Sequence, residues 1–465
     1  MKQKSMQAKT KEMKRNLAGS LLVLTAALLS AGCGGGKTNS APPPEIPAGS
    51  QGSQSHNYVG TQSLDGSGVL SPNFKYGGTW AITLDDTTKY FSYQNIGHEG
   101  YEGVNLISQG STTWVFPDAV PTVGASTGSG FLNLAATSGS TTGAAGYAVE
   151  VPGEAALLRP GDDTMSPVIS VATTGCPTLS GNVTYQFIGL GSPARTDKNT
   201  HVAYGSLQAS NSATTWNFTN LNMYTFDGTS LSPTALPTGN CGYTQLGYAV
   251  SIAPSTATNG FTVTTAVSPS GYFIMDQGQG EVANGYVLEI AGGGSGSYGP
   301  TGPLGLVGVQ QPSSALNTSS IVGGKYLGFE FDPVDDSLGK AGTWPVIFGQ
   351  TAGSGTIMTG GAFPNDDPTQ TAPSNITLDL GPEDAKNNGL YTNVTVTVPD
   401  IHKGCVQEPF GGTDADGNPT CIFHGVAVVG NPAGKFAIFV TVNDLSQAVS
   451  HYAADAALHF FLYQQ

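Results

Sequence analysis

The sequence predicts an all-β protein built from tandem antiparallel units, each of them a barrel or a sandwich. Gly accounts for 65 of the 465 residues, about twice its ordinary share. Short runs rich in Val, Thr and aromatic residues alternate between apolar and polar side chains along much of the chain. Clusters of Gly, Pro, Asn and Ser separate these runs at short spacing, which is typical of strands joined by tight turns.

The clearest strand signal is at residues 394–398, where Val and Thr alternate as a half-buried strand requires. Between Phe218 and Leu221 the apolar phase slips, which predicts a β-bulge. Only residues 445–456 show a helical period, so we expect one short C-terminal helix, followed by a strand through residues 459–463. Further strands are predicted at residues 80–84, 89–93, 183–190, 261–267, 286–290, 326–331, 376–380 and 436–442.

Four ordered segment matches predict a repeat, with residues 177–312 and 313–465 as two copies of one β unit. An N-terminal β region at residues 66–176 would precede them. The alternative architecture is a β-propeller, although propeller blades recur at about 40–50 residues, a closer spacing than these matches show. The matches pair residues 181–191 with 324–333, 202–205 with 346–349, 268–277 with 431–440, and 308–311 with 461–465. In space, we expect residues 202–205 to fall on 346–349, and 272–275 on or beside 436–438.

The first residues indicate export. Residues 1–16 carry six basic side chains against one acid, and residues 17–29 form an apolar run of 13. That run is shorter than the roughly 20 residues that a spanning helix needs. A basic region, a short apolar run and small residues after it are typical of a cleaved signal peptide, here residues 1–32.

The string LSAGC, which ends at Cys33, resembles the lipobox of bacterial lipoproteins. The resemblance implies cleavage before Cys33, lipid on that cysteine and attachment to a membrane. It departs from the usual pattern at Ser30, where Leu is common. The residue after Cys33 is Gly34 and not Asp, and in this the chain resembles lipoproteins that are sent on to the outer membrane or cell surface. Residues 33–65, rich in Gly, Ser, Gln and Pro, would then be a lipid-anchored flexible tether.

The charge excludes one class of partner. The formal net charge is −15, and 11 basic against 31 acidic residues remain after residue 32. We therefore expect no nucleic-acid partner, because phosphate contact needs a basic face. No cofactor motif is present, and we expect no cofactor.

Four cysteines follow Cys33, and an even number in an exported protein predicts two disulfides. We favour the pairs Cys176–Cys241 and Cys405–Cys421, because each falls inside one proposed unit. The alternative for the second pair is a zinc site with His402 and His424, in the pattern H-x2-C…C-x2-H.

Other candidate sites have weaker patterns. Asp414, Asp416 and Asn418 place oxygen ligands at alternate positions, as calcium loops do, although position twelve is Gly425. GASTG, with Ser126, fits a nucleophile motif but lacks the helix that should follow it. The paired acids that a glycosidase needs occur at Asp85-Asp86, Glu99/Glu102, Asp162-Asp163, Asp335-Asp336 and Asp366-Asp367. The aromatic residues able to stack on a sugar are Trp80, Trp114, Trp216 and Trp344.

From these features we expect a membrane-anchored exported protein with a non-enzymatic binding or structural role at the cell envelope. Its ligand would be a protein, a glycan or a small molecule. The alternative is an exported polysaccharide hydrolase that uses paired carboxylates, which predicts two acids facing one cleft lined by aromatic side chains.

Overall fold

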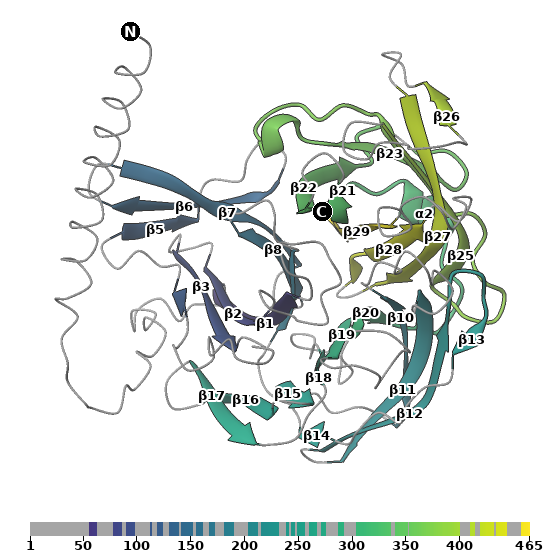
Figure 1. The fold of residues 1–465 in the computed structure, drawn as a ribbon. Helices are drawn as coiled ribbons and strands as arrows, with labels where there is room; N and C mark the ends of the chain where they lie inside the picture. The colour runs from purple at the N-terminus through teal and green to yellow at the C-terminus, as the bar shows by residue number, and fades with distance from the viewer. Residues whose placement is uncertain are drawn as a thin grey trace, which may run out of the picture. The chain divides into compact units, whose positions relative to one another are not determined.

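In the computed structural model of the chain, the described residues form three antiparallel sheets that follow one another in sequence (Figure 1). The all-β prediction is therefore confirmed. The structure describes residues 55–62, 78–85, 90–97, 112–113, 119–123, 130–138, 141–151, 155–160, 167–172, 181–189, 203–212, 215–231, 239–240, 243–246, 249–255, 260–266, 271–275, 287–292, 304–335, 340–351, 353–399, 410–413, 419–431, 434–443 and 457–465.

The first sheet has nine strands in the order β4-β3-β2-β1-β9-β8-β7-β6-β5. Its bounds are β1 (Ser55–Gln62), β2 (Gly78–Asp85), β3 (Tyr90–Gly97), β4 (Thr112–Thr113), β5 (Ala119–Val123), β6 (Leu132–Ser138), β7 (Thr141–Val151), β8 (Ala155–Pro160) and β9 (Val168–Ala172).

The second sheet has eleven strands in the order β13-β12-β11-β10-β20-β19-β18-β15-β16-β17, with β14 also paired to β12. Its bounds are β10 (Val183–Gly189), β11 (Tyr204–Ser212), β12 (Thr215–Tyr224), β13 (Ser230–Leu231), β14 (Gly239–Asn240), β15 (Tyr243–Leu246), β16 (Ala249–Ser255), β17 (Gly260–Ala266), β18 (Gly271–Met275), β19 (Val287–Gly292) and β20 (Leu304–Gln310).

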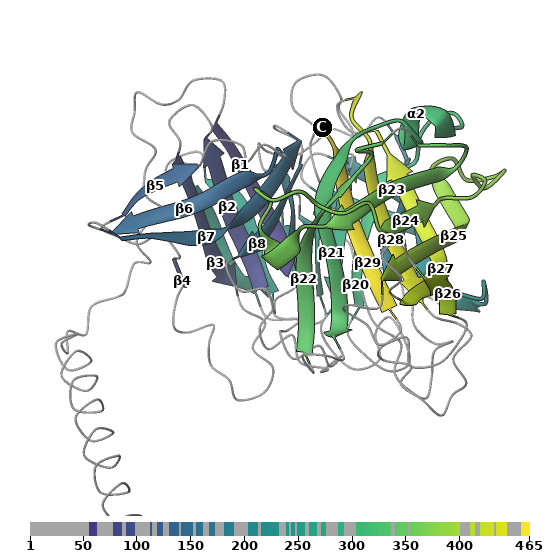
Figure 2. The same cartoon turned by 90° about the horizontal axis from the view of Figure 1, so that it is seen from above.

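The third sheet closes on itself as an eight-stranded barrel, because β25 pairs with β27 and β21 pairs with β29. Figure 2 shows β21, β29, β28 and β27 along the barrel wall. β26 pairs with β27 outside the closed ring. The bounds are β21 (Tyr326–Asp335), β22 (Lys340–Phe348), β23 (Ile357–Ala362), β24 (Ile376–Asp379), β25 (Leu390–Pro399), β26 (Phe410–Thr413), β27 (Pro419–Gly430), β28 (Ala437–Asn443) and β29 (Ala457–Gln464).

All ten predicted strands are present in these sheets. The bulge is also confirmed: Gln208 pairs with Thr219 and Ser206 with Asn222, so Leu207 has two residues opposite it. A short helix that we did not predict, α2 (Thr318–Val322), precedes the barrel. The predicted helix at 445–456 lies outside the described residues. No helix in the described part of the chain is long and apolar enough to cross a membrane.

Each sheet pairs its first strand with its last: β1 with β9, β10 with β20, and β21 with β29. The registers at two of these pairings agree, since Tyr185 lies opposite Gln310 in the second sheet and Tyr326 lies opposite Gln464 in the barrel. In both, the amide of the next residue on the closing strand donates to the carbonyl before the tyrosine, at 2.8 and 2.9 Å. The opening and closing strands of the two proposed copies therefore occupy equivalent positions.

The internal matches do not coincide. Tyr204 begins β11 and pairs near the end of β10, whereas Phe348 ends β22 and pairs with the start of β21. β18 is separated from the closing strand β20 by β19, whereas β28 pairs directly with the closing strand β29. The correspondence we expected for residues 202–205 and 272–275 is therefore wrong. Duplication of the whole unit remains a prediction, and it rests on the equivalent positions of the opening and closing strands.

Alternation along β21 places apolar side chains on both faces of the barrel wall. Tyr326 belongs to the core inside the barrel, together with Val346, Val396 and Phe460. Leu327, Phe329 and Phe331 face outward, into a core shared with residues of the first and second sheets. Successive strand residues point to opposite faces, so Glu330 faces the barrel interior, on the side of Tyr326.

Candidate functional site

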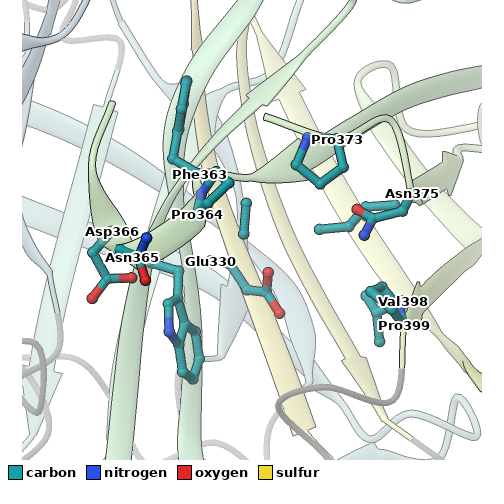
Figure 3. A pocket seen from close by; sticks show the side chains of 12 residues that line it. Glu330, Phe363, Pro364, Asn365, Asp366, Pro373, Asn375, Val398 and Pro399 are labelled. Carbon is teal, nitrogen blue, oxygen red and sulfur yellow. The ribbon is translucent and has the colours of Figure 1, made fainter. Parts of the chain in front are cut away.

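A pocket of about 410 Å³ lies at one end of the barrel (Figure 3). Its lining comes from the middle of β21 and β22, the ends of β23 and β25, the start of β24 and the segment that joins β23 to β24. Barrel mouths are common ligand sites. The lining residues are Glu330, Trp344, Ala362, Phe363, Pro364, Asn365, Asp366, Pro373, Asn375, Ile376, Val398 and Pro399.

The floor of the pocket combines a carboxylate with an indole. Glu330 on β21 pairs across the sheet with Trp344 on β22, so both side chains stand on the inner face. Both are nearly buried, with 2% and 8% of their surface exposed. Gly342 leaves room for the indole, since a Cβ there would lie 2.2 Å from the Trp344 ring. Any larger residue at Gly342 would therefore displace the indole.

The rim is a short 3-10 turn, η2 (Pro364–Asp366), that follows β23. Asn365 and Asp366 have φ values of 53° and 56°, in the left-handed region. Asn and Asp tolerate this region better than other non-Gly residues, but two in succession are strained. The Phe363 amide donates to Pro345 O at 3.0 Å, which ties the turn to β22.

Asp367, the next residue, caps the turn that follows. Its Oδ1 accepts from the Thr369 hydroxyl at 2.7 Å and from the Thr369 amide at 2.9 Å. The hydrogen bond from the Thr369 side chain lowers the pKa of Asp367 below its ordinary value. The Asp367 carboxylate is thus engaged in hydrogen bonds with the loop that follows it.

Asp366 makes an ion pair with the first sheet. Arg159 Nη2, on β8, lies 3.0 Å from Asp366 Oδ2, and the Arg159 side chain is 6% exposed. Burial raises the pKa of Tyr147, and Asp367 raises it further. The guanidinium of Arg159 thus gives Asp366 a partner of opposite charge from the first sheet.

The pocket is suited to a ligand without negative charge. Its walls present flat apolar faces from Trp344, Phe363 and three prolines, while two carboxylates and two amides supply hydrogen-bond acceptors and donors. Among the described residues that line it, none is basic. A neutral or cationic group with a flat apolar face and several hydrogen-bond donors matches these walls.

The structure places one of the predicted acid pairs at this site, but divides it. Asp366 lines the pocket and Asp367 caps the adjacent turn. Trp344 is the predicted aromatic residue that lies in the pocket. Glu330 was not predicted, because a strand reading Gly-Phe-Glu-Phe-Asp suggests a solvent-facing acid. The other predicted acid pairs lie wholly or partly outside the described residues, and the side chains of Trp80, Trp114 and Trp216 are not described.

The zinc alternative is wrong for His424. On β27, Cys421 belongs to the core inside the barrel, whereas His424 is exposed and its Nδ1 lies 3.2 Å from the Thr395 hydroxyl. Residues three apart in a strand face opposite ways, so these two cannot bind one ion. Cys421 is disulfide-bonded. Cys405 lies outside the described residues, so its pairing with Cys421 stays a prediction.

Several predicted residues lie outside the described part of the chain, and their roles stay predictions: Cys33, Cys176, Cys241, Ser126, His402, Asp414, Asp416 and Asn418. Within the described residues, no group of three or more His, Cys, Asp or Glu side chains is arranged to hold a metal ion.

No family model matches the chain, and no curated protein matches it in sequence. Among solved structures, it is similar to two mutant forms of transferrin-binding protein B from Haemophilus parasuis, at 9% identity with TM-scores of 0.23 and 0.26. In each comparison the matched region covers 89% of this chain and 76% of the transferrin-binding protein. The isotype 1 transferrin-binding protein B from serogroup B Neisseria meningitidis is 11% identical, with a TM-score of 0.23, over 89% of this chain and 77% of that chain. Likeness at this level supports no conclusion on function or partner.

Proposed function

We propose that the protein is an exported, lipid-anchored binding protein of the cell envelope that holds a ligand in the barrel mouth. The observation that carries the proposal is the pocket itself. It combines flat apolar walls with a few placed polar groups, as small-molecule sites do, and its volume lies within their usual range of about 300–1,000 Å³. Anchoring rests on the N-terminal sequence, whose basic, apolar and LSAGC segments are arranged as in lipoproteins.

The ligand class follows from the lining. Sugar rings present an apolar C–H face to an indole or a proline ring, and their hydroxyls donate to carboxylates and amides. An anionic ligand would meet Glu330 and Asp366 without a basic partner in the described lining. We therefore favour a neutral saccharide or a sugar-bearing surface component.

The test is binding of defined neutral disaccharides, cellobiose, maltose and N,N′-diacetylchitobiose, measured by saturation-transfer NMR and calorimetry. Glu330→Gln and Trp344→Phe should weaken binding of the preferred disaccharide at least tenfold. Asn222→Ala, on the exposed part of β12, is the matched control and should bind as wild type. If none of the disaccharides binds, or if both pocket variants bind as wild type, the proposed site is wrong. Binding of arginine or spermidine instead would replace the saccharide by a cationic ligand.

Anchoring is tested separately. Cys33→Ala should abolish incorporation of labelled palmitate and leave the signal uncleaved. Normal processing with unchanged membrane association in that variant would contradict lipidation. Ser30→Ala, which alters the preceding motif without removing the thiol, is the matched control.

A second candidate function is hydrolysis of polysaccharide, because Glu330 and Asp366 line one pocket beside Trp344. A hydrolase of this kind needs two carboxyl groups free to act on the sugar, whereas Asp366 is engaged in an ion pair with Arg159. The observations therefore favour binding. Release of reducing ends from a soluble polysaccharide by the wild type, lost in Glu330→Gln, would establish hydrolysis instead.

A further inference from the structure

We propose that Arg159 is a positioning residue for the barrel-mouth pocket, so that the first sheet forms part of the ligand site from outside the barrel. Its guanidinium would hold the strained rim in the shape that the pocket requires. The ligand-binding part of this inference rests on the proposed function. The effect on the rim itself can be measured without any ligand.

The rim needs an external support. Two consecutive non-Gly residues, Asn365 and Asp366, adopt left-handed backbone conformations. Such conformations persist only where surrounding contacts fix them. Inside the turn, the Asp366 amide donates to Phe363 O at 3.1 Å and the Asp367 amide to Pro364 O at 3.1 Å, bonds that many turns of ordinary geometry also make. The turn's own hydrogen bonds therefore do not explain why the left-handed form is kept.

The first sheet supplies two contacts to this turn. Arg159 approaches Asp366 to 3.0 Å, and its side chain is 6% exposed while that of Asp366 is 24% exposed, so the cation is the more shielded partner. Phe131, just before β6, packs edge-on against Phe363 with ring centroids 5.7 Å apart and planes at 89°. Phe131 also packs at 5.7 Å against Phe329 on the barrel wall. A charged contact and an aromatic contact from the same sheet thus hold the two ends of the turn.

The supported residues are pocket residues. Phe363, Asn365 and Asp366 all line the cavity, and Figure 3 shows them on one side of the view, with Asn375, Val398 and Pro399 on the other. If Asp366 lost its cation, the turn would be free to return to right-handed backbone, and these three side chains would move together. Arg159, which does not line the pocket, would thereby control its shape.

The experiment measures hydrogen exchange in the intact protein by mass spectrometry. Arg159→Met should raise the exchange rate at least tenfold in peptides covering residues 363–367, and leave peptides from β28 and β29 unchanged. Arg159→Lys, which keeps the charge but loses the planar fork, should give an intermediate rate. Lys386→Met, which removes a positive charge from an exposed loop, is the matched control.

Two further variants complete the test. Asp366→Asn should reproduce the local increase in exchange. The double variant Arg159→Met/Asp366→Asn should add nothing further, because both changes remove the same ion pair. Arg159→Met should also weaken binding of the preferred disaccharide at least fivefold. Unchanged exchange at 363–367, or an increase spread equally over β28 and β29 in both Arg159 variants, would overturn the proposal. If no disaccharide binds the wild type, the proposed function fails while the exchange result still decides the role of Arg159.

Discussion

Gly328→Ala should separate β21 from β29, one of the strand pairs that close the barrel. Gly328 is the third residue of β21 and lies opposite Leu462 on β29. A Cβ built at Gly328 would lie 1.7 Å from the carbonyl oxygen of Phe461 and 2.8 Å from its carbonyl carbon. Both atoms are backbone, so no rotamer change relieves the overlap, and β29 itself must move.

The size of the effect follows from that overlap. A Cβ–O contact needs at least about 3 Å, so the strands must separate by more than 1 Å beyond their usual spacing of about 4.8 Å. Hydrogen bonds of about 2.9 Å beside Gly328 would then be broken. Losing two such bonds, with their buried groups left unsatisfied at about 1–3 kcal/mol each, outweighs the gain of about 0.5–1 kcal/mol from replacing Gly in a strand. We expect a loss of about 3 kcal/mol in the free energy of unfolding.

The assay is guanidinium denaturation followed by circular dichroism, with hydrogen exchange to assign the loss to β21 and β29. Gly434→Ala is the control, because Gly434 has nothing within 4 Å of an added Cβ and a φ of +78°, so only the backbone cost of about 1–2 kcal/mol applies. If Gly328→Ala unfolds within about 0.5 kcal/mol of wild type, the closed seam between β21 and β29 is wrong.

Three other outcomes are expected. Non-reducing peptide mapping should find Cys405 bonded to Cys421, closing a loop of 15 residues that stabilises the fold by about 3 kcal/mol in the chain-entropy model; a partner other than Cys405 would contradict the pairing. Burial raises the pKa of Tyr391 to about 12 and that of Tyr326 higher still, so the unfolded chain loses these protons first and stability should fall as pH rises above 10; Tyr326→Phe should flatten that fall, as measured by melting temperature against pH. Asn317→Ala, which removes the N-cap of α2, should cost about 1 kcal/mol, measured by thermal melting, with Asn317→Asp near wild type.

The strands could be predicted from sequence because alternation is local. Val394, Val396 and Val398 all reach the barrel core, as their pattern with Thr indicates. The slip after Phe218 likewise marks the bulge, since an extra residue changes which side chains share a face. Neither inference requires knowledge of which strands are neighbours.

Strand neighbours and the pocket could not be predicted in the same way. The pairing of β25 with β27 closes the barrel, and alternation is the same whether a strand stands in a barrel or at a sheet edge. Glu330 could not be recognised as a pocket residue from the sequence because both faces of β21 are covered. Phe329 and Phe331 pack outside the barrel, so the acid between them faces inward. Trp344 and Asp366 were candidates by residue type, but their convergence with Glu330 depends on the folded barrel.

The pairing of first with last strands bears on how the protein folds. In each sheet most strands pair with a neighbour in sequence, and such pairs can form early. The bond ladder between β21 and β29 instead joins residues at opposite ends of the unit, so the barrel cannot close until all its intervening strands are in place. Until then β21 and β29 each present an unpaired edge, which is open to association with another chain. Slow closure would therefore make aggregation during folding, rather than loss of the finished barrel, the main hazard for this protein.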